Sequence, residues 1–274
     1  MGKKSRRTKP AKQRMPFVAR TFEGLPAEGD WIAMREFVPA ATAHVTLTDG
    51  RRVRICSLLP GGGAGLVRPD GEIWVGLQVL HNHGDISRDL AHVIETGIDA
   101  EPGTPLTMSD PGVGARLQDL VDPASEFVVE VHDGFDFWID DPDAQARAAL
   151  DEANDTVAPT RRLEAVDSAY VTTMGEHTFL RWVMLEPEDA VLTAFSRLHA
   201  AGTSALTDDT KLIGMFRAHG VLVPVWELFA EVDLETATRD FAPLFAEAMA
   251  DDSPLTSEQR AAKQQLQSRQ VTVR

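Results

Sequence analysis

Three Asp-Gly pairs, each set between short runs of β-forming residues, place the strongest constraint on how this chain can fold. They are Asp49-Gly50, Asp70-Gly71 and Asp133-Gly134. An Asp-Gly pair is the strongest short-range signal for a β-hairpin, because a two-residue turn needs positive φ at both of its central residues. Met174-Gly175 predicts a fourth hairpin. The strand pairs that we expect are 45–47 with 53–55, 66–67 with 73–79, 128–131 with 135–139, and 170–173 with 178–183.

Capping residues and apolar periodicity predict helices between and after these hairpins. Asp30 and Ser87 are the expected caps of helices that run to Phe37 and to about Gly97. The other predicted elements are helices from Asp141-Pro142 to about Pro159, from Pro187 to Gly202, from Thr207 to His219-Gly220, over 235–250 and over 256–268, and a buried strand over 221–226, whose Pro224 suits an edge or a bulge.

The helix over 207–219 is predicted from an apolar stripe of Leu212, Ile213 and Phe216. Gly220 stands where a helix ends in a left-handed residue. One interpretation makes this segment and the following strand part of the core. In the other, Arg217, His219 and Trp226 project from the turn as a partner-binding patch, since Trp and Arg are enriched among interface anchors.

This order of elements predicts an α+β fold, with antiparallel hairpin-built sheets and helices packed on one side. The stretch 99–125 is rich in Pro, Gly and Asp and is the expected boundary between two lobes. We therefore expect a disordered basic tail over 1–20, an N-terminal α+β lobe over 21–110, and a C-terminal α+β lobe with the closing helices over 111–274.

Charge is distributed unevenly along the chain. The first 20 residues carry eight Lys and Arg and no acid, whereas the remaining chain has 19 Lys and Arg against 42 Asp and Glu. This remaining part of the chain, the body, is acidic enough to repel nucleic acid and anionic membranes. Only the tail is expected to contact a polyanion, and without aromatic residues other than Phe17 it suits phosphate contact rather than base recognition. The candidate nucleic-acid contacts are Lys3, Lys4, Arg6, Arg7, Lys9, Lys12 and Arg14.

Several classes of protein are excluded by what the sequence lacks. A single cysteine, Cys56, allows neither an intrachain disulfide nor a CxxC pair. No run of about 18 apolar residues could span a membrane, and no apolar stretch follows the basic tail as in a signal peptide. We therefore expect a cytoplasmic protein with no membrane partner.

Catalytic and cofactor motifs are also missing. Gly24 to Gly29 has the GxxxxG spacing of a phosphate-binding loop, but Asp30 stands where Lys is required and would repel a phosphate. A GxSxG nucleophile motif is absent. Cys56 lies in an apolar strand pattern, where a cysteine behaves as a small hydrophobe. The sequence thus predicts no cofactor.

The densest group of metal-ligand residues is His81-Asn82-His83 with Asp85. Alternate residues on an extended segment point to opposite faces, so His81 and His83 need a bend through Asn82 and Gly84 to act together. Neither an HExxH motif nor a longer spaced signature accompanies them. A polar connector is the competing interpretation.

Several blocks of sequence resemble an actinobacterial protein family of unknown function. They are MGKKSRR (1–7), WIAMREFVPAATA (31–43), IWVGLQV (73–79), GDISRDLA (84–91), EPGTPL (101–106) and LIGMFRAHGVLVPVWEL (212–228). Members of this family are sometimes labelled topoisomerase II or preprotein translocase, yet the chain has no ATP-binding loop and is too short for either ATPase. The resemblance implies no catalytic residue.

Two functions from different classes are left open. The favoured one is a non-enzymatic interaction protein, whose acidic body binds a protein partner and whose basic arm contacts nucleic acid or a ribonucleoprotein. The alternative is a metal-assisted hydrolase centred on His81, His83 and Asp85.

Overall fold

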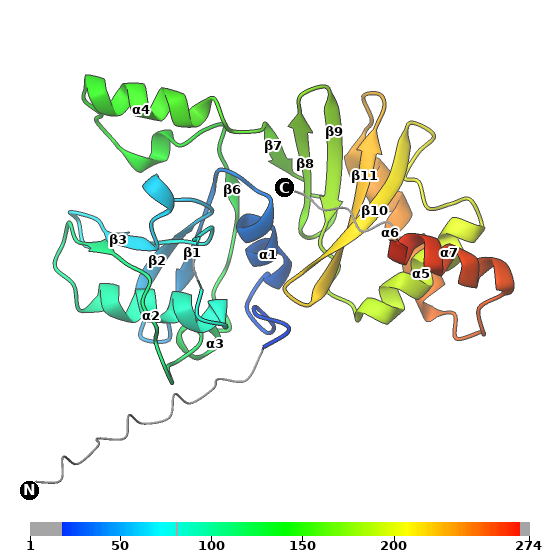
Figure 1. Ribbon diagram of the computed structural model, residues 1–274, viewed down its shortest axis with the longest axis horizontal. Helices are drawn as coiled ribbons and strands as arrows, with labels where there is room; N and C mark the ends of the chain where they lie inside the picture. The colour runs from blue at the N-terminus through cyan, green and yellow to red at the C-terminus, as the bar shows by residue number, and fades with distance from the viewer. Residues whose placement is uncertain (1–17, 81, 269–274) are drawn as a thin grey trace, which may run out of the picture.

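The computed structural model describes residues 18–80 and 82–268 and has the predicted α+β fold, built around two sheets (Figure 1). Its strands are β1 (Ala41–Thr46), β2 (Arg52–Cys56), β3 (Gly65–Val67), β4 (Ile73–Gly76), β5 (Pro105–Leu106), β6 (Glu130–Val131), β7 (Thr160–Arg162), β8 (Ala169–Met174), β9 (His177–Trp182), β10 (Thr210–Ala218) and β11 (Val221–Leu228). The α-helices are α1 (Glu28–Glu36), α2 (Ile86–Ile98), α3 (Leu117–Leu120), α4 (Ala144–Asn154), α5 (Glu188–Ala200), α6 (Leu234–Ala250) and α7 (Ser257–Ser268), and the 3-10 turns are η1 (Pro60–Gly62) and η2 (Asp136–Trp138).

The first sheet has the strand order β5-β3-β4-β2-β1-β6 and the second has β10-β11-β9-β8-β7. Neighbouring strands are antiparallel except β2 and β4, which run parallel. Figure 1 shows α1 between the two sheets, with α5, α6 and α7 gathered beyond the second sheet. Residues of α1 share one apolar core with Val45 of the first sheet and Val221 and Val223 of the second. The two sheets are therefore joined by packing through α1.

Three of the four predicted hairpins are confirmed, namely β1–β2, β3–β4 and β8–β9. The first two use a three-residue loop rather than the expected two-residue turn. Only the glycine has positive φ, 86° at Gly50 and 90° at Gly71. Asp49 and Asp70 instead accept a hydrogen bond from the backbone N–H two residues ahead, at 3.0 Å in each loop. These loops are type I turns that end in a glycine bulge.

The hairpin predicted at Asp133-Gly134 is wrong. β6 pairs with β1 through Ala41 and Val131, and the expected second strand is largely the 3-10 turn η2. Gly134 is needed for space rather than for a turn, because a Cβ there would lie 2.5 Å from the Asn154 side-chain oxygen. That oxygen accepts the Phe135 N–H at 2.6 Å.

The helix predicted over 207–219 is also wrong, because this segment is strand β10. A bulge between Leu212 and Gly214 shifts the pairing register of β10 with β11. The predicted stripe of Leu212, Ile213 and Phe216 does not form one face, because Leu212 packs in the core of the second sheet whereas Phe216 packs against the core that contains α1. His219 and Gly220 have φ of 47° and 85° and connect β10 to β11 as a two-residue turn.

Helix α1 is confirmed, but Asp30 is not its cap. The helix begins two residues earlier, after Ala27. Asp30 is 2% exposed, and its carboxylate accepts hydrogen bonds from Tyr170 Oη at 2.8 Å and from Arg162 Nη2 at 3.0 Å. An Asp that bonds across to the neighbouring sheet cannot also cap its own helix.

The remaining predicted elements lie close to their expected places. Asp85 rather than Ser87 caps α2, and α4 begins after Asp143 and ends at Asn154, short of Pro159. Helices α5, α6 and α7 and strand β11 are confirmed. Pro224 lies between the β9 ladder, which starts at Val225, and the bridge at Leu222, so its missing N–H falls in a gap.

The first sheet draws β6 from beyond residue 110. Sheet membership is not a test of independent folding, so the division into lobes over 21–110 and 111–274 stays a prediction. Within the described ranges, no helix has both the length and the apolar content to cross a membrane.

Gly220→Ala is expected to destabilise the protein more than Gly71→Ala. Both glycines have positive φ, which costs a side chain about 1–2 kcal/mol. A Cβ at Gly220 would also lie 2.7 Å from the Ala19 carbonyl oxygen, whereas a Cβ at Gly71 meets nothing within 4 Å. Urea unfolding of both variants measures the difference, and equal losses would show that residues 19–20 do not press on this turn.

Candidate functional site

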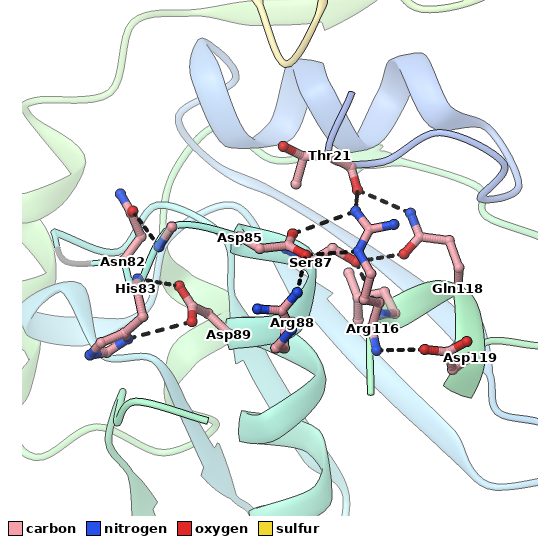
Figure 2. Close-up of polar contacts among 12 residues, drawn as sticks. Thr21, Asn82, His83, Asp85, Ser87, Arg88, Asp89, Arg116, Gln118 and Asp119 are labelled. Carbon is pink, nitrogen blue, oxygen red and sulfur yellow. Dashed lines mark hydrogen bonds and ion pairs between the residues drawn. The ribbon is translucent and has the colours of Figure 1, made fainter. Parts of the chain in front are cut away.

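A buried polar network surrounds the N-terminus of α2, next to the residues of the predicted metal site (Figure 2). The Asp85 side chain is 1% exposed and caps the helix by accepting the Ser87 N–H at 3.1 Å. The same carboxylate accepts Arg116 Nε at 2.8 Å and Arg88 Nη2 at 3.2 Å. Two guanidinium groups and a helix N-terminus therefore neutralise one buried carboxylate.

This network joins three distant segments of the chain. Arg116 Nη2 donates to the Thr21 carbonyl oxygen at 2.8 Å, and Gln118 Nε2 donates to the same oxygen at 3.0 Å. Ser87 Oγ donates to Gln118 Oε1 at 2.7 Å and accepts the Leu117 N–H at 3.0 Å. Figure 2 shows these groups converging where the N-terminal segment crosses α2 and α3. This polar network therefore has the geometry of a structural clamp that holds the three segments together.

His83 has a different partner from Asp85. Its backbone N–H donates to Asp89 Oδ2 at 2.7 Å, and its ring Nδ1 lies 3.4 Å from Asp89 Oδ1. The Asp89 side chain is 1% exposed, and its Oδ1 has no hydrogen bond among the described residues. This pair orients the His83 ring, which is 30% exposed.

This geometry gives little support to the predicted metal site. His81 lies outside the described residues, and Asp85 is committed to two arginines and a helix cap. Throughout 18–80 and 82–268, no three His, Cys, Asp or Glu side chains are grouped as a metal ion requires. Cys56 is no nucleophile either, because burial raises the pKa of its thiol to about 12.

Trp226 is one of the three residues of the proposed partner-binding patch, but it does not project from the β10–β11 turn. Its side chain is fully buried against Phe195 and Phe241, and its Nε1 donates to the Ser204 carbonyl oxygen at 2.9 Å. The prediction assumed a helix before the turn, whereas Trp226 pairs with Leu212 far along the hairpin.

Arg217 and His219 do lie at the turn, and both have partners. Arg217 Nε donates to Glu188 Oε2 at 2.9 Å. His219 Nε2 donates to Glu36 Oε1 at 2.9 Å, and its ring lies 4.8 Å from that of Phe22. His219 therefore fastens the turn to α1, with only 11% of its side chain exposed.

The candidate nucleic-acid contacts, Lys3 through Arg14, lie outside the described residues. Arg20, at the end of the predicted tail, belongs to the folded body instead. Its guanidinium bonds to both oxygens of Glu28, at 2.6 and 3.0 Å. Sequence reasoning also missed Arg116 and Gln118 as partners of the α2 N-terminus. Nothing in their local pattern signals a contact with segments about 30 and 95 residues earlier.

Replacing Asp85 by Ala is expected to lower the free energy of unfolding by about 3–5 kcal/mol, because Arg88 and Arg116 lose their shared carboxylate in a buried site. Asp119→Ala is the control, since this exposed Asp accepts one hydrogen bond, from the Arg116 N–H at 2.8 Å. It should cost about 1 kcal/mol. Urea unfolding of both variants tests the ranking, which equal losses would contradict.

The Glu36–His219 contact predicts a pH-dependent stability. The hydrogen bond from His219 lowers the pKa of Glu36 below its ordinary value. Ionised Glu36 therefore favours the folded chain above the unfolded pKa of about 4.3, and this contribution is lost as the pH falls through the folded pKa.

Glu36→Gln should accordingly be less stable than the wild type at pH 7, and this difference should shrink as the pH falls below the unfolded pKa of about 4.3. The loss is expected to stay below about 1 kcal/mol, because 39% of the Glu36 side chain is exposed. Chemical unfolding between pH 3 and about 7 measures it. Glu176→Gln, in the exposed β8–β9 turn, is the control, and a difference independent of pH would refute the assignment.

A comparison with known protein families matches residues 21–274 to a family of unknown function (DUF5926). The matched residues include both sheets and the clamp around Asp85. Neither a curated protein nor a solved structure matches the chain significantly. The match covers nearly the whole sequence and agrees with the resemblance seen in its blocks. The chain therefore belongs to the DUF5926 family of unknown function.

Proposed function

We propose that this chain is a non-enzymatic interaction protein whose arm, residues 1–20, contacts nucleic acid or a ribonucleoprotein while its acidic body binds a protein partner. The observation that carries this proposal is the separation of charge along the sequence. Eight Lys and Arg stand in the first 20 residues, and the remaining chain has a large excess of Asp and Glu.

The ion pairs of the body support this division of roles. Most Lys and Arg side chains in the described ranges lie within 4.0 Å of a carboxylate, so few cations are left for a polyanion. Surface pairs of this kind include Arg51–Asp49, Arg68–Asp140, Arg147–Asp136, Arg161–Glu235, Arg217–Glu188 and Lys263–Asp189. Excess carboxylates repel phosphate groups and attract basic protein surfaces.

The metal-assisted hydrolase at His81, His83 and Asp85 has less support. Asp85 is occupied by Arg88 and Arg116, and His83 pairs with Asp89. These contacts favour the connector interpretation of the segment. Stoichiometric metal in protein purified without chelator, lost in His83→Ala, would restore the hydrolase as a candidate.

The arm is tested by neutralising its seven outer cations to Gln while keeping Arg20, which the body needs. We expect the wild type to bind single-stranded RNA with an affinity that falls steeply with salt, because each phosphate contact releases counterions. The neutralised variant should lose this binding. Fluorescence anisotropy across a salt series measures both.

A matched control neutralises Arg52, Lys211 and Arg239, which are body cations with no carboxylate within 4.0 Å among the described residues. This variant should keep an RNA affinity close to that of the wild type, because the arm is unchanged. Undiminished binding by the neutralised arm, or loss of binding in the body variant, would contradict the proposal.

A further inference from the structure

We propose that a cavity between α1 and the second sheet, lined by the buried side chain of Arg181, binds a small organic monocarboxylate. This is a ligand site of the body and is independent of the arm's proposed contact with nucleic acid. The cavity has a volume of about 350 Å³ and opens where the end of α1 faces β8 and β9. That volume is sufficient for a small ligand.

Arg181 is buried, and no carboxylate of the described residues lies within 4.0 Å of it. It is 4% exposed, and its Nε has no hydrogen bond among the described residues. Its Nη2 reaches only the thioether sulfur of Met174, at 3.3 Å, which is a weak acceptor. Burial lowers the pKa of Arg181, yet a guanidinium stays charged at neutral pH. This buried positive charge thus forms no ion pair with a carboxylate of the described residues.

The other described arginines with a buried Nε show how unusual this is. Four more have a buried Nε without a hydrogen bond, and each of them lies within 4.0 Å of a carboxylate. Their pairs are Arg35–Glu36, Arg54–Glu72, Arg88–Asp85 and Arg197–Asp251. Arg181 alone in this group has no described carboxylate within 4.0 Å, and the Phe37 and Phe179 ring centroids lie 5.6 and 6.0 Å from its Cζ. Both distances are near the limit of a cation–π contact.

The lining of the cavity indicates the kind of anion. Phe37, Pro39, Ala158 and Met174 form apolar walls that suit a hydrocarbon body. A planar carboxylate matches the fork of donors on a guanidinium. Met174 is 40% exposed at the end of β8, so its sulfur can give way to a ligand oxygen.

One unpaired cation matches a single negative charge better than two. Glu36 also lines the cavity, and it keeps a negative charge there because His219 and Arg35 hold its carboxylate. A phosphate dianion would meet this carboxylate with only one guanidinium to balance it. The cavity is therefore expected to prefer a monocarboxylate to inorganic phosphate.

The experiment measures binding of benzoate, hexanoate, benzamide and inorganic phosphate to the full chain by calorimetry and by thermal shift. Benzamide keeps the shape of benzoate without its charge. We expect benzoate or hexanoate to bind and to raise the melting temperature, with benzamide and phosphate weaker. Arg181→Met should weaken carboxylate binding about tenfold or more, the loss expected for a charge-assisted hydrogen bond. The same variant should melt at or above the wild-type temperature without ligand, because it removes an uncompensated buried charge.

Two further variants keep the test decisive. Ala158→Phe fills the cavity while leaving Arg181 in place, so it should abolish binding even if Arg181→Met fails to fold. Arg239→Met changes an exposed arginine of α6 and should bind like the wild type. The proposal is overturned if neither carboxylate binds the wild type, if benzamide or phosphate binds as tightly as the carboxylates, or if binding survives in both cavity variants.

Discussion

The burial of α1 between the two sheets is the constraint on which the rest of the structure depends. Trp31, Ile32 and Met34 are fully buried, and they share a core with residues of both sheets. A buried aromatic residue of this kind stabilises a fold by about 3–5 kcal/mol relative to Ala. Without α1, each sheet would expose an apolar face to water.

Polar groups on α1 determine its orientation within that core. Asp30 bonds to Tyr170 and Arg162 of the second sheet, and Glu28 bonds to Arg20 of the incoming segment. Burial and the neighbouring Asp30 carboxylate raise the pKa of Tyr170, which keeps its hydroxyl protonated as a donor. A buried carboxylate with these partners is costly to move, so it specifies one register of helix against sheet.

The same use of buried charge recurs around Asp85, and it explains why polar residues that look reactive in the sequence are structural in the fold. Asp85 and Glu36 are each held by arginine or histidine from another segment. Arg181 departs from this pattern, because its positive charge is buried beside a cavity and no described carboxylate lies within 4.0 Å of it. That contrast is why the cavity, rather than the denser cluster around His83, is the stronger candidate for a ligand site.

The sequence by itself determined the fold class, three hairpins and most helices, because turn chemistry and capping act over a few residues. Gly50 and Gly71 mark hairpins through the positive φ that their turns require, and Pro187 starts α5 from its local backbone preference. Gly220 illustrates the limit, since a left-handed residue suits a helix end and a hairpin turn equally, and the apolar spacing of Leu212, Ile213 and Phe216 fits a helix although the segment is a strand. Only the tertiary structure decided that β10 is a strand, that Asp30 bonds to Tyr170, and that no described carboxylate pairs with Arg181. These outcomes depend on contacts between residues far apart in the chain, and no local pattern records them.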